Sequence, residues 1–297
     1  MNGLRRLRSP IRWFGGKGHM TAKLLPYLTA WPHHRYVEVF GGGASVLFAK
    51  RPAEVDVYND LDEGLADFFR VLADPRAFGR FHRRVGLLPY SRAIYNDCRQ
   101  HWADSGDRVE RAAAWFVVAR QSFSGKFAEG WSTTVTKSCR GMAAEVSKWL
   151  STIDGLPQVH ARLRRVQIEQ QDWRVILERY DTPETLFYLD PPYVHGTRRS
   201  GGYAHELVDD DHRELVFKLA AIRGQACLSG YESPLYAPLL RGGWKRVSWQ
   251  LSCSVAGGTR ASGLQGPNSL RTKQPRTEIL WYSPGIAAAL KAIRRTA

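Results

Sequence analysis

The sequence predicts an α/β protein with an open sheet and a ligand site at one edge of that sheet. The apolar strand 185–189 stops abruptly at Asp190-Pro191-Pro192-Tyr193. The strand 36–39 enters the glycines 41–43 and then a helix, and the strand 55–58 ends in Asn59-Asp60. A strand, a glycine loop and a helix in succession place a nucleotide-like ligand at the carboxyl edge of a sheet, where the other two stretches also end.

The residues that follow strand 185–189 form a rigid hydrogen-bond acceptor. Two successive prolines fix φ and remove two backbone donors, which leaves the Asp190 carboxylate and the Pro191 carbonyl to accept hydrogen bonds. Two such acceptors suit the two N–H bonds of an exocyclic amine on a nucleobase, and Tyr193 can stack on the base. A plain turn is the alternative, since Pro-Pro commonly ends a strand. The neighbouring motifs decide between the two interpretations.

Two glycine-containing segments and one acid accompany this acceptor. Trp13-Phe14-Gly15-Gly16-Lys17 suggests a loop where backbone approaches a ligand closely, although a plain turn also explains it. Glycines 41–43 lack the Gly-Lys-Ser/Thr of a phosphate loop and the spacing of the dinucleotide fingerprint. Asp60 is placed to hydrogen-bond ribose hydroxyls or to cap a helix over 61–72, and both roles can hold at once.

The pattern along the chain predicts three parts, 1–66, 67–169 and 170–297. The middle part shows helical stretches without strand-like alternation, and it carries 17 basic and 10 acidic residues. It therefore indicates a mainly helical, basic insertion with a polar loop over 121–140. The predicted helices of this part cover 77–85, 91–102 and 109–120. Around it, the α/β pattern predicts strands at 166–169, 226–229, 244–250 and 277–282, a helix that ends at Tyr180 and a helix over 209–222.

Charge is segregated along the sequence. The formal net charge is +15 and the pI is about 9.9. Residues 1–23 hold six basic side chains and residues 241–277 hold seven, and neither stretch contains an acid. Such clustering favours a polyanionic partner, most simply a nucleic acid.

Other classes of protein are disfavoured. No apolar run approaches the roughly 20 residues of a membrane span, and no apolar segment of a signal peptide follows the N-terminal arginines. A cytoplasmic protein is therefore expected. The cysteines at 98, 139, 227 and 253 stand far apart, which predicts reduced thiols and neither a zinc site nor any other metal site.

Taken together and in this order, these motifs resemble the Dam-type DNA adenine methyltransferases over nearly the whole chain. The resemblance implies the Rossmann-like mixed sheet of the S-adenosylmethionine-dependent methyltransferases with an inserted, mainly helical target-recognition domain. It also implies methyl transfer to N6 of an adenine flipped out of double-stranded DNA at specific sites. S-adenosylmethionine is the implied cofactor, with no metal.

The resemblance also assigns roles to residues. The implied catalytic residues are Asp190, Pro191, Pro192 and Tyr193. The implied cofactor-binding residues are Trp13, Gly15, Lys17, Phe40, Gly41, Gly43, Asp60, Asp172 and Asp190, with Gly16 in the same N-terminal motif. The DNA-binding candidates are Arg120, Ser124, Lys126, Arg198, Arg271 and Lys273.

Two positions depart from the family pattern. Val39 replaces a usual proline, and Ser124 stands where Asn is common, in the region that reads DNA. Three alternatives stay open at this point. Methylation of cytosine N4 presents the same exocyclic amine, although such enzymes more often have Ser at the position of Asp190. RNA methylation is the second alternative, and an inactive DNA-binding protein of the same fold is the third.

Overall fold

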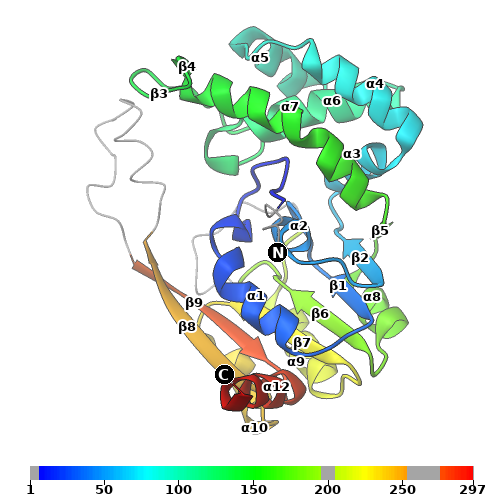
Figure 1. Ribbon diagram of the computed structural model, residues 1–297, viewed down its shortest axis with the longest axis vertical. Helices are drawn as coiled ribbons and strands as arrows, with labels where there is room; N and C mark the ends of the chain where they lie inside the picture. The colour runs from blue at the N-terminus through cyan, green and yellow to red at the C-terminus, as the bar shows by residue number, and fades with distance from the viewer. Residues whose placement is uncertain (1–6, 195–204, 253–274, 297) are drawn as a thin grey trace.

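A seven-stranded mixed sheet forms the lower half of the molecule in Figure 1. The computed structural model describes residues 7–194, 205–252 and 275–296. Five neighbouring strands are parallel, and β9 runs antiparallel between β7 and β8. In spatial order the strands are β5 (Val166–Glu169), β2 (Val55–Asn59), β1 (Arg35–Glu38), β6 (Thr185–Leu189), β7 (Gln225–Gly230), β9 (Pro275–Tyr282) and β8 (Lys245–Ser252). The predicted mixed α/β sheet is confirmed.

The central strand β6 is buried on both faces, because helices cover both sides of the sheet. Leu186 and Tyr188 pack into one core, whereas Phe187 and Leu189 pack into the other. This alternation follows from the period of two along a strand. The first face is covered by α1 (Thr21–Ala30), α2 (Ser45–Ala49) and α12 (Pro284–Thr296). The second is covered by α8 (Trp173–Tyr180), α9 (Asp209–Ala220) and α10 (Ala237–Arg241).

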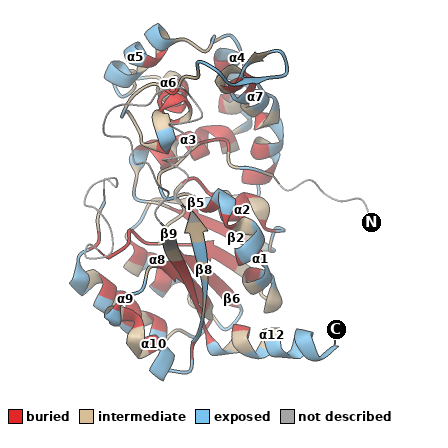
Figure 2. Ribbon diagram, turned by 90° about the vertical axis from the view of Figure 1, so that its left-hand side faces the viewer, coloured by how far each residue is buried: buried red, intermediate tan, exposed pale blue. Residues whose placement is uncertain are grey.

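A helical part stands above the sheet in Figures 1 and 2. The parallel rings of Phe68 and Phe116, whose centroids lie 5.5 Å apart, pack in its buried interior. That interior is continuous with the core on the α1 face of the sheet. The helices are α3 (Glu63–Ala73), α4 (Pro75–Gly86), α5 (Arg92–His101), α6 (Arg108–Gln121) and α7 (Ala144–Leu163), with the short strands β3 (Ser138–Cys139) and β4 (Met142–Ala143) before α7. The helices predicted over 77–85, 91–102 and 109–120 are confirmed as α4, α5 and α6.

The antiparallel strand β9 has a consequence for the site. The parallel strands β1, β2, β6 and β7 all end at one edge of the sheet, and β9 begins at that edge because it runs the other way. The first residues of β9 therefore lie beside the segments that follow β6 and β7. Three short 3₁₀ turns complete the description: η1 (Lys17–His19), η2 (Phe123–Gly125) and η4 (Pro234–Tyr236).

The sequence predicts no membrane span and reduced cysteines, and the described residues bear on both points. Among these residues, no helix is long and apolar enough to cross a membrane. Cys98, Cys139 and Cys227 are free thiols, and Cys253 lies outside the described residues.

Candidate active site

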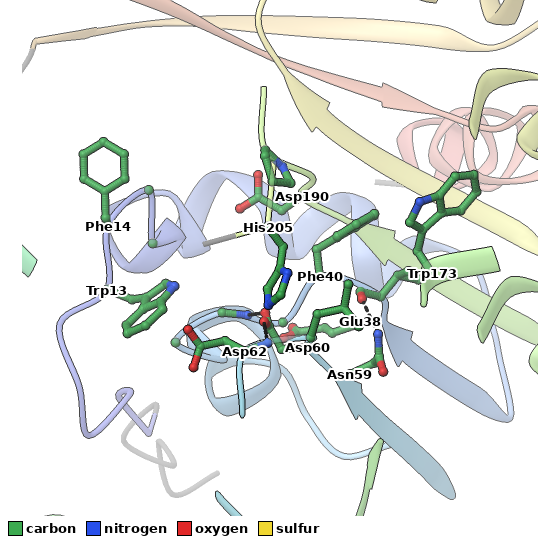
Figure 3. A pocket seen from close by; sticks show the side chains of 18 of the residues that line it. Trp13, Phe14, Glu38, Phe40, Asn59, Asp60, Asp62, Trp173, Asp190 and His205 are labelled. Atoms are coloured by element: carbon green, nitrogen blue, oxygen red, sulfur yellow. Dashed lines mark hydrogen bonds between the residues drawn. The ribbon is translucent and has the colours of Figure 1, made fainter. Parts of the chain in front are cut away.

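A cavity of about 880 Å³ opens at the carboxyl edge of the parallel strands. Its walls come from the N-terminal segment, from the loops after β1, β2 and β6, from the start of α8 and from the helical part. Figure 3 shows Asp190 and Asp60 entering it from different strand ends, with Trp13 toward one end and Trp173 toward the other. All the cofactor-binding candidates named from the sequence line this one cavity: Trp13, Gly15, Lys17, Phe40, Gly41, Gly43, Asp60, Asp172 and Asp190.

Lys17 joins the N-terminal motif to the end of β6. Its side chain is only 7% exposed, and Nζ lies 2.7 Å from each carboxylate oxygen of Asp190. Nζ also donates to the carbonyl of Gly15, at 3.1 Å. Gly15 has a φ of 73°, a conformation that glycine adopts without strain. The glycines of this motif thus turn the chain so that the lysine reaches back to the aspartate.

The glycine loop after β1 is held against Asp60. The backbone N–H of Gly42 donates to one carboxylate oxygen of Asp60 at 2.7 Å, and that of Asp62 donates to the other at 3.0 Å. Burial raises the pKa of Asp60 to about 6 against the lowering effect of these two hydrogen bonds. A carboxylate has about four acceptor positions, so Asp60 retains acceptor capacity toward the cavity.

The helix-capping role considered for Asp60 is wrong. Helix α3 begins at Glu63, and its N-cap is Asp62, whose carboxylate accepts the N–H of Leu65 at 2.9 Å. The acid two residues before the cap turns instead toward Gly42. The physical reason is that the glycine loop offers Asp60 an N–H donor from a different strand end.

Asp172 and Asn59 fix the cavity wall at the start of α8. Asp172 caps α8 by accepting the N–H of Arg174 at 2.8 Å. The side-chain amide of Asn59 donates to the carbonyls of Val39 and Gln171, and its oxygen accepts the N–H of Gln171. Buried Asn59 therefore ties together the chain segments that follow β1, β2 and β5.

The helical part supplies an aromatic wall. The Trp13 ring lies 5.8 Å from that of Trp115, which in turn stacks on Phe127 at 5.5 Å. Gly125 has a φ of 74°, and an added Cβ there would lie 3.2–3.3 Å from the Arg12 and Trp13 backbone. Because the two parts approach so closely, the N-terminal motif is held between the glycine loop and the helical part.

Tyr193 is buried at the margin of this site and does not line the cavity. It is 9% exposed, and its hydroxyl donates to Oε1 of Glu278. Burial, followed by the charge of Asp190, raises its pKa well above the usual value. Lys17 Nζ stands 5.0 Å from the ring centroid, and Tyr231 packs edge-on at 4.5 Å. Pro192 lines the cavity, whereas Pro191, which is also buried, does not.

Among the DNA-binding candidates, three lie in the described residues. Lys126 lines the cavity and pairs with Glu129 at 2.8 Å. Ser124 has a φ of 57°, in the left-handed region that Asn adopts more readily than Ser. Arg120 is half-buried, and burial lowers the pKa of its guanidinium to about 10. Arg198, Arg271 and Lys273 lie outside the described residues.

Sequence reasoning missed several side chains of this region. Glu38 lines the cavity, and burial raises its pKa to about 8 while Tyr36 donates a hydrogen bond to it at 2.8 Å. Its place between a strand and a glycine loop could have identified Glu38 as a residue of the site. Trp115 and Glu278 carried no such signal, because only the fold brings them to the site.

No metal centre is evident in the described part of the chain. There, no three or more His, Cys, Asp or Glu side chains gather in a way that could hold a metal ion.

The fold and the cavity define a class of protein. The mixed seven-stranded sheet is the fold of an S-adenosylmethionine-dependent methyltransferase. The glycine loop after β1 and the acid after β2 line one cavity of this fold. The family model of the D12 class N6 adenine-specific DNA methyltransferases matches residues 13–232. The chain belongs to this family, whose activity is the methylation of adenine in DNA.

The chain is also similar to solved structures. One similar solved structure is described as "crystal structure of a putative RNA methyltransferase PH1948 from Pyrococcus horikoshii". It is 9% identical, with a TM-score of 0.36, over 92% of this chain and 85% of that chain. No curated protein matches the chain.

Proposed function

We propose that the Asp190 carboxylate and the Pro191 carbonyl hold the N6 amino group of an adenine flipped out of duplex DNA, with S-adenosylmethionine bound in the adjoining cavity. One observation carries the proposal. Asp190 lines the same cavity as the glycine loop and Asp60, and both its oxygens lie 2.7 Å from Lys17 Nζ. An acceptor for the reacting amine and the residues expected to hold the cofactor therefore share one cavity.

The residues present fit this cofactor. A Cβ at Gly41 would fall 2.2 Å from the Tyr58 ring, so the loop follows a path that only glycine allows. Asp60 offers acceptor positions to ribose hydroxyls, while Trp13 and Phe40 offer aromatic surface. We assign the binding of the cofactor to these residues together with Gly15, Lys17, Gly43 and Asp172.

The proposed mechanism rests on hydrogen bonding and position. S-adenosylmethionine, when bound, supplies an electrophilic methyl group. Adenine N6 is a poor nucleophile because its lone pair is delocalised into the ring. Hydrogen bonds from its two N–H groups to Asp190 and to the Pro191 carbonyl favour a pyramidal nitrogen, which restores the lone pair. Asp190 also stabilises the positive charge that develops on that nitrogen, and the methylated nitrogen returns to neutrality by losing one N–H proton to solvent. Correct positioning supplies much of the rate.

Lys17 holds Asp190 in place in the proposed mechanism. Its ammonium lies 2.7 Å from both oxygens of Asp190, so it fixes the orientation of the carboxylate that accepts the hydrogen bonds of the amine. No protein nucleophile and no covalent intermediate are needed. The base has to leave the duplex first, since its amino group is otherwise paired and inaccessible.

We assign target recognition to the helical part and place its second boundary ahead of β5. Strand β5 pairs with β2 in the main sheet, so the predicted part 67–169 includes one strand that belongs to the sheet. The helical part carries the excess of positive charge counted above and contributes Lys126 and Phe127 to the cavity wall. A basic part beside the opening for the base is suited to bind double-stranded DNA.

Nucleoside analysis tests the proposal. Purified protein is incubated with duplex DNA and S-adenosylmethionine, with and without a metal chelator, and the digested nucleosides are analysed by mass spectrometry. N6-methyladenine is expected in both samples. N4-methylcytosine alone, or a requirement for magnesium, would overturn the assignment.

Variants separate binding from chemistry. Asp60→Ala should weaken calorimetric binding of S-adenosylmethionine roughly tenfold or more, since it removes an acceptor of hydroxyl hydrogen bonds. Asp190→Ala should abolish methyl transfer. Glu184→Gln is the matched control, because this carboxylate is 69% exposed before β6, at the opposite edge of the sheet. Normal cofactor binding and turnover in both site variants would disprove the assigned roles.

A further inference from the structure

Glu278 reaches the active site from the antiparallel strand. Ile279 of β9 lies opposite Gly230, the last residue of β7, so Glu278 stands at the edge where the parallel strands end. Alternation along β9 sends Ile279 and Trp281 into the core on the α8 face of the sheet, and Leu280 into the core on the α1 face. Glu278 shares the face of Leu280, which is also the face from which Lys17 approaches.

The carboxylate of Glu278 contacts two residues of the site at once. It accepts the hydroxyl of Tyr193, and the same oxygen lies 3.5 Å from Lys17 Nζ. Lys17 in turn lies 2.7 Å from both oxygens of Asp190. Glu278 thus links the Tyr193 ring to the lysine that contacts the catalytic carboxylate.

Packing alone does not explain a carboxylate at this position. The Glu278 side chain is 8% exposed, and burial of an ionisable group is costly unless a partner compensates. Burial raises the pKa of Glu278, and the charge of Lys17 opposes that rise. A neutral acceptor such as glutamine would satisfy the Tyr193 hydroxyl equally well. Among the described residues, the charge of Glu278 therefore acts toward Lys17, 3.5 Å away.

We propose that Glu278 is a positioning residue for methyl transfer, which fixes the Tyr193 ring through its hydroxyl and holds Lys17 between two carboxylates. This inference rests on the proposed role of Asp190 in methyl transfer. Lys17 lies between Asp190 on one side and Glu278 on the other, so loss of the Glu278 charge shifts the attraction on the ammonium toward Asp190 and the Gly15 carbonyl. Its place relative to the reacting amine then changes, although cofactor contacts elsewhere in the cavity are intact.

A double-mutant cycle tests the contact between Glu278 and Tyr193. Turnover is measured for wild type, Tyr193→Phe, Glu278→Ala and the double variant, together with calorimetric binding of S-adenosylmethionine. Tyr193→Phe should lower kcat about tenfold, the value of one hydrogen bond to a charged group, and Glu278→Ala should lower it further because it also removes the charge beside Lys17. The double variant should be no slower than Glu278→Ala, because the hydroxyl has then already lost its acceptor. The dissociation constant of the cofactor should change less than about threefold.

Glu278→Gln distinguishes positioning from support of the fold. Glutamine keeps a neutral acceptor for the hydroxyl, so Tyr193→Phe should still cost about fivefold in this background. It removes the charge toward Lys17, so Glu278→Gln alone should still lower kcat severalfold. Glu184→Gln makes the same chemical change at the opposite edge of the sheet and should leave kcat unchanged.

Three outcomes would overturn the inference. The first is that the effects of Tyr193→Phe and Glu278→Ala on kcat multiply in the double variant, and the second is that Glu278→Gln turns over at the wild-type rate. The third is that the variants lose cofactor affinity or thermal stability while kcat is unchanged. Failure of the proposed function looks different, because the wild-type protein would then form no N6-methyladenine. If Glu278→Ala does not fold, the Glu278→Gln and Tyr193→Phe arms decide the matter.

Discussion

Replacement of Gly41 by alanine should weaken both the fold and the proposed binding of S-adenosylmethionine. A Cβ built on Gly41 lies 2.2 Å from Cε2 and 2.5 Å from Cδ2 of Tyr58, far inside van der Waals contact. Tyr58 has little freedom to move, since it is fully buried. Its hydroxyl donates to the Gly42 carbonyl at 2.8 Å, and its ring packs edge-on against Phe69 at 4.9 Å. The loop must therefore shift away from the ring.

The size of the effect follows from these contacts. One extra carbon in a close-packed core costs about 1–3 kcal/mol. Each kcal/mol corresponds to roughly 2–4 °C in Tm for a chain somewhat smaller than this one, so a decrease of about 2–12 °C is expected. The N–H of Gly41 donates to Asn59 and its carbonyl accepts from Ala44, both at 2.8 Å. A displaced loop also moves Gly42 relative to Asp60, and S-adenosylmethionine should bind about tenfold more weakly.

Thermal unfolding and calorimetric titration measure the two effects, and Gly18→Ala is the matched control. A Cβ on Gly18 would meet only the Ser45 hydroxyl oxygen, at an ordinary contact distance of 3.7 Å. Gly41→Ala combined with Tyr58→Ala should cost little more than Tyr58→Ala alone, because the obstructing ring is gone. If Gly41→Ala matched Gly18→Ala in both Tm and affinity, the reasoning from close approach would be refuted.

Three further predictions concern pH, backbone conformation and charge. The folded-state pKa of Glu38, about 8, exceeds its usual value of 4.5, so its contribution to stability is present below pH 4.5 and is lost as pH rises toward 8. Glu38→Gln should therefore unfold at a higher temperature than wild type at pH 9 but not at pH 4, and an equal difference at both pH values would contradict this. Ser124→Asn should add about 0.5–1 kcal/mol to the free energy of unfolding in denaturant titrations, because Asn tolerates a φ of 57° better; a decrease would count against the strain. Replacing Arg271, Lys273 and Arg276 by alanine should reduce the slope of log affinity for DNA against log salt by about 0.9 for each phosphate that the segment no longer neutralises, while an unchanged slope would show that this segment does not touch phosphate.

Strands that end in a strong local signal could be predicted from the sequence. The structure gives β6 the predicted bounds, because five buried residues stop at a proline pair that cannot continue a ladder. The outer strands are less well predicted. Strand β8 covers Lys245–Ser252 where 244–250 was expected, and β9 begins at Pro275 and not at 277. Their ends depend on pairing with each other, which a single-sequence pattern does not contain.

The helix start after β2 shows where local signals fail. Asp60 and Asp62 both precede the helix, and either acid has the chemistry of an N-cap. Only the tertiary contact separates them, because the N–H of Gly42 comes from a loop 18 residues away in sequence. The same argument explains why the family resemblance named Asp60 as a cofactor ligand when its own neighbours favoured a cap.

The contacts of the N-terminal segment explain why the cavity needs both parts of the chain. Arg12 pairs with Glu145 of α7 at 2.8 Å, and Trp13 packs against Trp115 of α6. Five residues after Arg12, Lys17 pairs with Asp190 at the end of β6. A segment too short for a core of its own is thus fixed at one end by the helical part and at the other by Asp190, which follows β6. Because the same segment lines the cavity between these two anchors, the cavity takes this shape only when the helical part is packed against the sheet.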